Sequence, residues 1–389
     1  MAYTFAFFDV GINRIGTDTE KWDWACDIYG PVLPFWVADM DFKCPPGVTA
    51  ALSNRAAHPS YGYTRVTDDD ADALIGFWAR RHGVTFGRDH IIMLPTVVTG
   101  LALCVKAMTH PGDGVVIQPP VYGPFYSVIK ANNRTLLENP LIRDENGRWR
   151  MDLDGLASLF QKGARLMFLC SPHNPVSRVW TADELNALAD LCRLYGVALI
   201  SDEIHADFVY AGHPFHSMLG MSGMRTAALF SASKTFNIAG LQQASLVSYD
   251  RELLDAVRHL KEECGVSSGN LFALTATRAA YTEGDEWLDG LIAYLTEGAR
   301  VLTDALFSQL PLCRTAKIEG TYLAFLDLTA YGFSTAELME RTIRAGALFS
   351  EGTFFSPMFH NGWLRFNFAC PHRLITEGVC RLKAALEGI

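Results

Sequence analysis

Short, continuous apolar runs recur through the first two thirds of the chain and are separated by turns or by helical patterns. They occupy residues 91–94, 115–117, 165–170, 197–202 and 227–231. Such runs are typical of strands that are buried on both faces, as in parallel sheets. Because helical patterns separate several of them, we predict an α/β fold with a mostly parallel sheet and right-handed crossovers.

Apolar residues at helical spacing predict helices at 48–56, 68–82, 101–108, 182–195 and 287–310. The fourth is best defined, because Thr181 and Glu184 form a capping box and Gly196 follows its end. Residues 319–327 and 363–368 then predict strands. We divide the chain into an N-terminal arm with part of a small domain (1–45), a large domain (46–285) and a C-terminal small domain (286–389).

Composition narrows the possible partners. The chain has 389 residues, a net charge of −9 and no run rich in Lys or Arg, which disfavours nucleic acid and anionic membranes. No apolar stretch reaches the roughly 18 residues of a membrane span, and the N-terminus lacks a positive segment, so we expect a cytoplasmic protein. The nine cysteines include no Cys-x-x-Cys pair, and His213 and His216 flank a proline, so we expect no metal site.

Polar residues follow four of the predicted strands at or just past their carboxyl ends: Tyr122, Asn174, Asp202 and Lys234. Ligands bind at this edge of open parallel sheets. Each residue alone is ambiguous, since a tyrosine there can cap the core and an aspartate can complete a turn. Four at one edge predict a functional site.

Lys234 lies in the segment 231–240, directly after the run 227–230. An ammonium group is costly to place at the end of a buried strand, so a packing role is disfavoured. It can form a Schiff base with a carbonyl, as in pyridoxal phosphate enzymes, or be an ordinary surface lysine. The turn after residues 91–94 can likewise bind a phosphate through the Val97 and Val98 amides, although any strand-to-helix turn exposes such donors.

Four motifs together resemble fold-type I pyridoxal phosphate enzymes of the aspartate aminotransferase superfamily: Ser-Pro-His-Asn-Pro at 171–175, Ser-Asp-Glu-Ile-His at 201–205, Ser-Ala-Ser-Lys-Thr-Phe-Asn at 231–237 and Arg-Phe-Asn at 365–367. Residues 33–42, 61–63 and the Asp-Glu-Ile-His string at 202–205 more narrowly resemble the MalY/PatB group of cystathionine beta-lyase-like C–S lyases. The resemblance spans nearly the whole chain. It implies a large, cofactor-binding domain with a mostly parallel sheet of the seven-stranded type, and a smaller α+β domain.

By this resemblance Lys234 would hold pyridoxal 5'-phosphate as a Schiff base, Asp202 would pair with the pyridinium nitrogen, and Tyr122 would stack on the ring. Asn174 and His205 would lie near the 3-oxygen, although aminotransferases usually have tyrosine at the position of His205. The implied phosphate contacts are the Val97 and Val98 amides, Ser231, Ser233 and, from a second subunit, Tyr63. A homodimer is therefore implied.

The resemblance also implies a substrate site. Arg365 would clamp the α-carboxylate with a bidentate fork, opposite Asn174 and the Val37-Ala38 backbone. Aromatic residues between 22 and 36 would help to shape the pocket. Ser177 and Ser356 stand where the family frequently has glycine, so these two loops can differ in path.

The activity that the resemblance implies is α,β-elimination of L-cystathionine, L-cystine or other S-substituted cysteines to a thiol, pyruvate and ammonia. An aminotransferase shares every step through Cα deprotonation, and the motifs between 171 and 240 do not separate the two. A third interpretation is a regulator-binding protein that keeps the fold for protein contacts. Lys234, Asp202 and Arg365 argue against a purely binding role.

Overall fold

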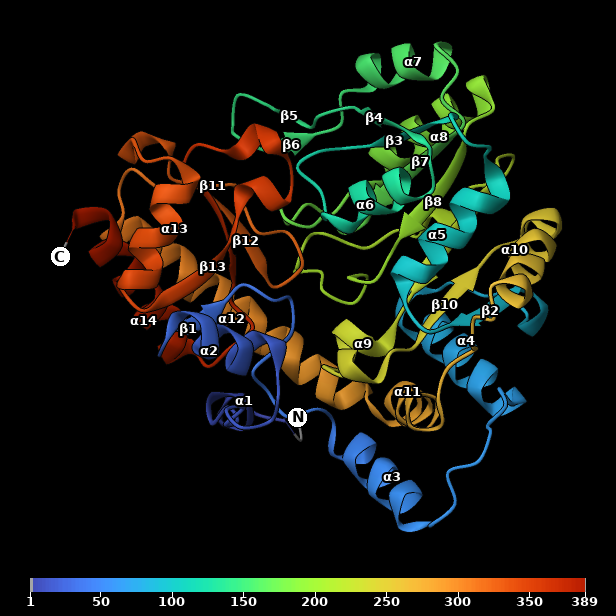
Figure 1. Ribbon diagram of the computed structural model, residues 1–389, viewed down its shortest axis with the longest axis horizontal. Helices are drawn as coiled ribbons and strands as arrows, with labels where there is room; N and C mark the ends of the chain where they lie inside the picture. Colours follow the sequence, from blue (N-terminus) through green and yellow to red (C-terminus); the bar gives the residue numbers. More distant parts are fainter. Residues whose placement is uncertain (1–2, 389) are drawn as a thin grey trace.

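The computed structural model describes residues 3–388, and its larger part is built on a seven-stranded sheet (Figure 1). The order of the strands is β2 (Ile91–Leu94), β10 (Ala244–Val247), β9 (Thr226–Phe230), β8 (Ala198–Asp202), β7 (Leu166–Cys170), β3 (Gly114–Ile117) and β4 (Thr135–Glu138). Neighbours from β9 to β4 are parallel, and β10 is antiparallel to β9 and to β2. The predicted fold class is confirmed, whereas β4 and β10 were not predicted.

Alternate residues of these strands pack into different layers, because side chains in a strand point to opposite faces. Phe168 and Ile200 pack with α5 (Val97–Met108), α6 (Pro124–Ala131) and α10 (Arg251–Glu263). Met167 and Leu199 pack on the other face with α7 (Leu153–Gln161) and α8 (Ala182–Tyr195). Phe230, the last residue of β9, belongs to a third cluster with α4 (Asp68–His82) and α11 (Leu271–Glu283). The sheet is therefore covered on both faces.

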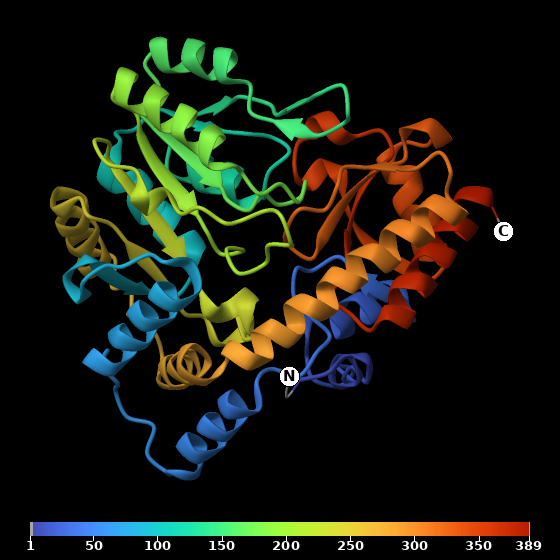
Figure 2. The same ribbon diagram turned by 180° about the vertical axis from the view of Figure 1, so that it is seen from behind.

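A second, five-stranded sheet forms the smaller part and draws on both ends of the chain. Its order is β1 (Leu33–Phe35), β13 (Ala347–Glu351), β14 (Trp363–Asn367), β12 (Leu323–Asp327) and β11 (Arg314–Thr315). The N-terminal strand β1 pairs in parallel with β13. The helices α13 (Thr335–Arg344) and α14 (His372–Glu387) lie beside it. The long helix α12 (Asp285–Gln309) runs diagonally from the larger part to the smaller, as Figure 2 shows from behind.

The remaining segments complete the arm and the loops. The arm contains α1 (Phe5–Asp9), a π-helical turn at Glu20–Trp24 and α2 (Ala25–Tyr29), and α3 (Pro46–Ala57) follows it. A short hairpin joins β5 (Ile142–Arg143) to β6 (Trp149–Arg150). The predicted strand 319–327 begins only at Leu323, because residues 319–322 form a loop. The helix expected at 101–108 begins four residues earlier, at Val97.

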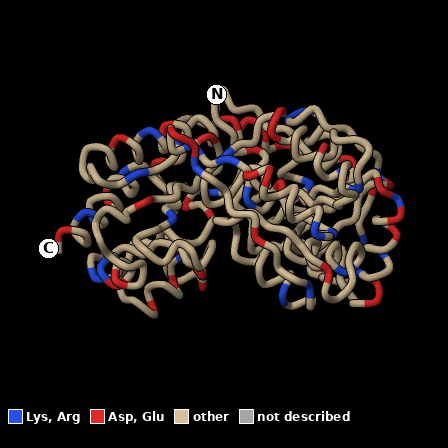
Figure 3. The backbone as a smooth tube through the Cα atoms, turned by 90° about the horizontal axis from the view of Figure 1, so that it is seen from above, with Lys and Arg blue, Asp and Glu red and all other residues tan. Residues whose placement is uncertain are grey.

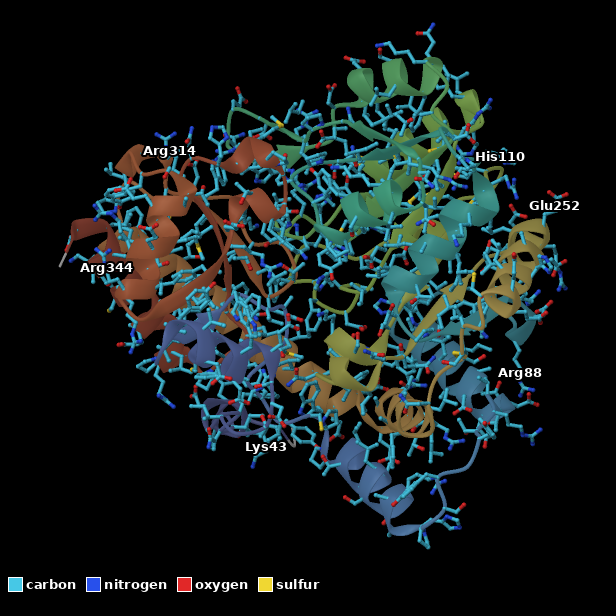
Figure 4. All side chains as sticks on the ribbon, viewed as in Figure 1. Lys43, Arg88, His110, Glu252, Arg314 and Arg344 are labelled. Atoms are coloured by element: carbon cyan, nitrogen blue, oxygen red, sulfur yellow. The ribbon has the colours of Figure 1, made fainter. Side chains whose placement is uncertain are left out.

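Charged residues of both signs are interspersed over the backbone in Figure 3. The charged side chains labelled in Figure 4, among them Arg88, Glu252 and Arg344, project outward at the periphery. Among residues 3–388, no helix is long and apolar enough to cross a membrane. Over the same range, no group of His, Cys, Asp and Glu residues is arranged to hold a metal ion.

Candidate active site

A cavity of about 1370 Å³ lies where the carboxyl ends of the large sheet, the small sheet and the arm meet. It brings together every predicted site residue except one: Val37, Ala38, Val97, Val98, Tyr122, Asn174, Asp202, His205, Ser231, Ser233, Lys234 and Arg365 all line it. The exception is Tyr63, which is fully exposed in the loop between α3 and α4 and does not line this cavity. Its contact with a second subunit stays a prediction.

Lys234 lies on α9 (Ala232–Thr235), a single helical turn that follows β9, and not at the end of the strand itself. Ser231 caps this turn, because its Oγ accepts the Ser233 N–H at 3.0 Å and donates to the Gln243 carbonyl at 2.5 Å. The Lys234 ammonium nitrogen Nζ donates to the Ala38 carbonyl at 2.7 Å. The Ser231 hydroxyl is thus already engaged, and its predicted contact with a phosphate stays a prediction.

Burial lowers the pKa of Lys234, and the positive charge of Arg365 lowers it further, whereas Asp39 and Asp202 oppose this shift. Desolvation disfavours the ammonium form. A lysine in this position is therefore easier to deprotonate than one on the surface, which suits an amine that acts as a nucleophile or a base.

Asp202 is the last residue of β8 and is only 3% exposed. Burial raises the pKa of its carboxyl to about 7, while the N–H of Ile204, 3.2 Å away, and the charge of Lys234 lower it. Such a carboxylate is stabilised by a cation brought into the cavity. Burial lowers the pKa of the neighbouring His205 to about 3, so its ring is neutral, and its Nδ1 has no hydrogen-bond partner.

The start of α5 offers an anion site at one end of the cavity. Thr96 caps the helix, and its Oγ1 accepts the Thr99 N–H at 3.0 Å. The N–H groups of Val97 and Val98 precede the first intrahelical hydrogen bond, so they are available to a ligand. The helix dipole adds to their attraction for an anion such as a phosphate.

Arg365 projects from the middle of β14 and is 4% exposed. One terminal nitrogen donates to Asn174 Oδ1 at 3.1 Å, and the other donates to Ser350 Oγ at 3.0 Å and to the Trp36 carbonyl. Its Nε has no partner, and the Phe355 ring lies 4.9 Å from the guanidinium carbon. Burial lowers its pKa to about 10, so the guanidinium stays charged at neutral pH. The fork is suited to a carboxylate.

Several residues to which the sequence analysis assigned no role fix the backbone of the segment 36–42. Asn367 Nδ2 donates to the carbonyls of Val37 and Asp39 at 2.6 and 2.7 Å. Asn237 Nδ2 donates to Met40 O at 2.8 Å, and the Tyr322 hydroxyl donates to Ala38 O at 3.0 Å. Asn237 and Asn367 lie within the motifs at 231–237 and 365–367, and their place in these motifs is the feature of the sequence that could have identified them.

The two serines that replace glycine are accommodated differently. Ser177 has a φ of 59°, in the left-handed region that favours glycine. Its carbonyl accepts the N–H groups of Glu319 and Gly320 at 3.1 and 3.2 Å, which hold this turn in place. Ser356 instead has extended backbone, and its Oγ accepts the Met358 N–H at 3.2 Å. Only the first loop therefore keeps the conformation that glycine favours.

A buried lysine, an aspartate and an arginine thus meet at one cavity of a mixed α/β fold. The chain belongs to the family described as aminotransferase class I and II, whose sequence model matches residues 33–382. Comparison with individual proteins is more specific. The chain is 39% identical to "Cystathionine beta-lyase PatB" of Bacillus subtilis (strain 168), over 98% of this chain and 100% of the relative.

Two solved structures are similar over nearly their whole length. A pyridoxal-phosphate-bound putative aminotransferase from Clostridium difficile 630 has a TM-score of 0.94 at 35% identity, covering 97% of this chain and 99% of that one. Cystalysin from Treponema denticola, which contains a pyridoxal 5'-phosphate cofactor, has a TM-score of 0.92 at 31% identity and covers 98% of both chains.

Proposed function

We propose that this chain is a pyridoxal-phosphate-dependent C–S β-lyase. It would convert L-cystathionine, L-cystine or other S-substituted cysteines to a thiol, pyruvate and ammonia. The observation that carries the proposal is the convergence of Lys234, Asp202 and Arg365 on one cavity, in a chain 39% identical to a cystathionine beta-lyase.

The residues of the cavity fit the proposed cofactor. An aldehyde needs an amine, which Lys234 offers, and a pyridinium nitrogen needs an anion, which the buried Asp202 offers. A phosphate needs donors, and those proposed are the Val97 and Val98 amides with Ser231 and Ser233. The unpartnered His205 Nδ1 supports a polar ligand at the same place. When bound, pyridoxal phosphate supplies an electron sink for a carbanion at the substrate Cα.

The remaining residues would bind and orient the substrate. Arg365, held by Asn174, would take the α-carboxylate in two parallel hydrogen bonds. The Lys234 amine would accept the Cα proton, and the electrons of the broken C–S bond would leave with the sulfur as a thiolate. Tyr122 would cover the cofactor ring, and three other aromatic residues of the cavity, Trp24, Trp36 and Phe354, would surround the leaving group.

An aminotransferase is the second candidate. It is favoured by the structural similarity to a protein described as a putative aminotransferase. The same lysine, aspartate and arginine serve both reactions, because both remove the Cα proton. A requirement for an α-keto acid separates them, since transfer of the amino group needs an acceptor and elimination does not.

The test is to incubate the purified protein with cystathionine, cystine and S-methylcysteine, without any keto acid, and to follow pyruvate and free thiol over time. We expect both products from at least one substrate, and none from Lys234→Ala, which lacks the proposed base. Wild-type protein that releases no pyruvate from any of the three would contradict the proposal. Turnover that begins only after a keto acid is added would support the aminotransferase.

We further propose a cytoplasmic homodimer in which Tyr63 reaches the phosphate site of the other subunit. This is supported by the full exposure of Tyr63 in a loop whose residues 58–65 are all exposed. For the domains we keep boundaries after residues 45 and 285. The start of α12 at Asp285 supports the second boundary.

A further inference from the structure

Four charged residues of the arm form a closed cluster next to the cavity. Arg14 contacts Asp39 at 2.7 Å and Asp41 at 3.1 Å, and Lys21 contacts Asp41 at 3.0 Å and Asp39 at 3.6 Å. The Trp22 indole N–H donates to Asp41 at 2.8 Å. Lys21 is only 1% exposed, which is unusual for a lysine. The two cations and two anions balance each other.

Stability alone does not explain this cluster, because buried ion pairs often contribute no more than well-packed apolar residues of the same size. Its position suggests another role. Asp39 lines the cavity and Asp41 does not. Asp39 also directly follows Ala38, whose carbonyl accepts the Lys234 Nζ at 2.7 Å. The cluster therefore fixes the carboxylate of Asp39 in the cavity that Lys234 lines, one residue after the carbonyl that contacts Lys234.

The other groups near Lys234 come from separate parts of the chain. Asp202 lies at the end of β8, Glu20 on the π-helical turn of the arm and Arg365 on β14, while the rings of His205 and Tyr322 are neutral. Among these charges Asp39 has the strongest effect on the pKa of Lys234, ahead of Arg365 and Asp202. Arg14 holds the Asp39 carboxylate with two hydrogen bonds, at 2.7 and 2.8 Å, so its direction is fixed.

We propose that Asp39 is a positioning residue for Lys234: held by Arg14 and Lys21, its carboxylate favours a proton on the lysine nitrogen, and its backbone sets the Ala38 carbonyl against that nitrogen. This rests on the proposed function, because the nitrogen concerned would be the one that joins Lys234 to the cofactor. A proton there makes the attached carbon more open to attack by the amine of a substrate.

The test is a pH titration of the holoenzyme, followed by the visible absorbance of the bound pyridoxal phosphate, which reports this proton without any turnover. In Asp39→Asn the midpoint should fall by about one pH unit, because a negative charge close to the nitrogen is lost. Asp41→Asn is the matched control, since it removes the same charge from the same partners but away from the cavity. Its midpoint should stay within about 0.3 of the wild type. An unchanged midpoint in Asp39→Asn, or equal shifts in both variants, overturns the proposal.

A second variant covers the case in which Asp39→Asn does not fold. Arg14→Gln removes a positive charge that neutralises Asp39, so the midpoint should rise, and a constant or lower midpoint overturns the proposal. If the wild-type protein binds no pyridoxal phosphate, both the proposed function and the role of Asp39 are overturned. If it binds the cofactor but releases no pyruvate, only the proposed lyase activity is overturned, because the titration still tests Asp39.

Discussion

Arg365 is charged although it is only 4% exposed, and all of its hydrogen-bond partners are neutral. Within residues 3–388 no carboxylate lies within 4.0 Å of its guanidinium, and its partners are the oxygens of Asn174, Ser350 and Trp36. A buried charge without a counter-ion is costly. The arginine is thus arranged for an anionic ligand, and the α-carboxylate of an amino acid meets that need.

Replacing Arg365 should therefore impair substrate binding more than the chemical step. We expect Arg365→Ala to lower kcat/KM by about 100-fold or more, since a charge-assisted fork contributes roughly 3 kcal/mol. Arg365→Lys should recover only part of this loss, because a point charge does not reproduce two parallel hydrogen bonds. Steady-state kinetics with the best substrate measure both. An unchanged kcat/KM in Arg365→Ala would make the arginine a structural residue.

At the scale of elements, a buried ionic network ties α8 to the loop before β12. Arg178, which is fully buried, donates to Glu319 and to Glu184 at 2.6 Å each. The Val179 N–H also donates to Glu319, at 3.0 Å. This loop includes Gly320, which contacts the Ser177 turn close to Asn174. The network therefore links the packing of the two sheets to the shape of the site.

Breaking this network should destabilise the protein. In Glu319→Gln, Arg178 loses the buried one of its two counter-ions and keeps only the partly exposed Glu184, so we expect the free energy of unfolding to fall by about 3 kcal/mol. Urea unfolding, followed by far-UV circular dichroism, measures the change. The control is Arg300→Gln, which removes two ion pairs on the exposed face of α12, with Glu297 and Asp304, and should leave the urea midpoint unchanged. Equal midpoints for all three proteins would show that the buried network does not contribute.

The elements that sequence analysis identified are those whose pattern is local. The strands β7, β8 and β9 are buried along their whole length, so they appear as continuous apolar runs. The strand β4 was missed because it is an edge strand with exposed ends, and β10 because Ser245 interrupts its short run. The start of α5 was missed because Val97 to Gly100 do not resemble a helix.

The active site, too, could be predicted only where its pattern is local in the sequence. Its principal residues lie in motifs, whereas the contacts that hold them join distant parts of the chain. Asn367 and Val37 are 330 positions apart, and Asn237 and Met40 are 197 apart. No periodicity in one sequence predicts such pairs, because they depend on how the two sheets meet.

At the scale of the whole molecule, variants of Tyr63 and Lys234 can test whether different subunits contribute these two residues to one active site. If Tyr63 serves the other subunit, mixing Tyr63→Ala with Lys234→Ala during refolding creates dimers with one wild-type site. About a quarter of all sites should then be wild type, given random pairing. Activity per site in the mixture, compared with each variant alone, measures this.

The control is a mixture of Arg365→Ala with Lys234→Ala. Both of these residues line the same cavity of one chain, so no dimer of the two variants contains an intact site. A Tyr63 mixture that gains no activity over its separate components would place the tyrosine outside the active site of the other subunit.

The parallel pairing of β1 with β13 sets an order for assembly during synthesis. The segment 36–42 leaves the ribosome long before β13 (Ala347–Glu351), the strand that pairs with β1. The partners of the backbone around Ala38 are also synthesised late, Tyr322 before β13 and Arg365 and Asn367 after it. The strands of the large sheet are therefore synthesised before the residues that complete the active site.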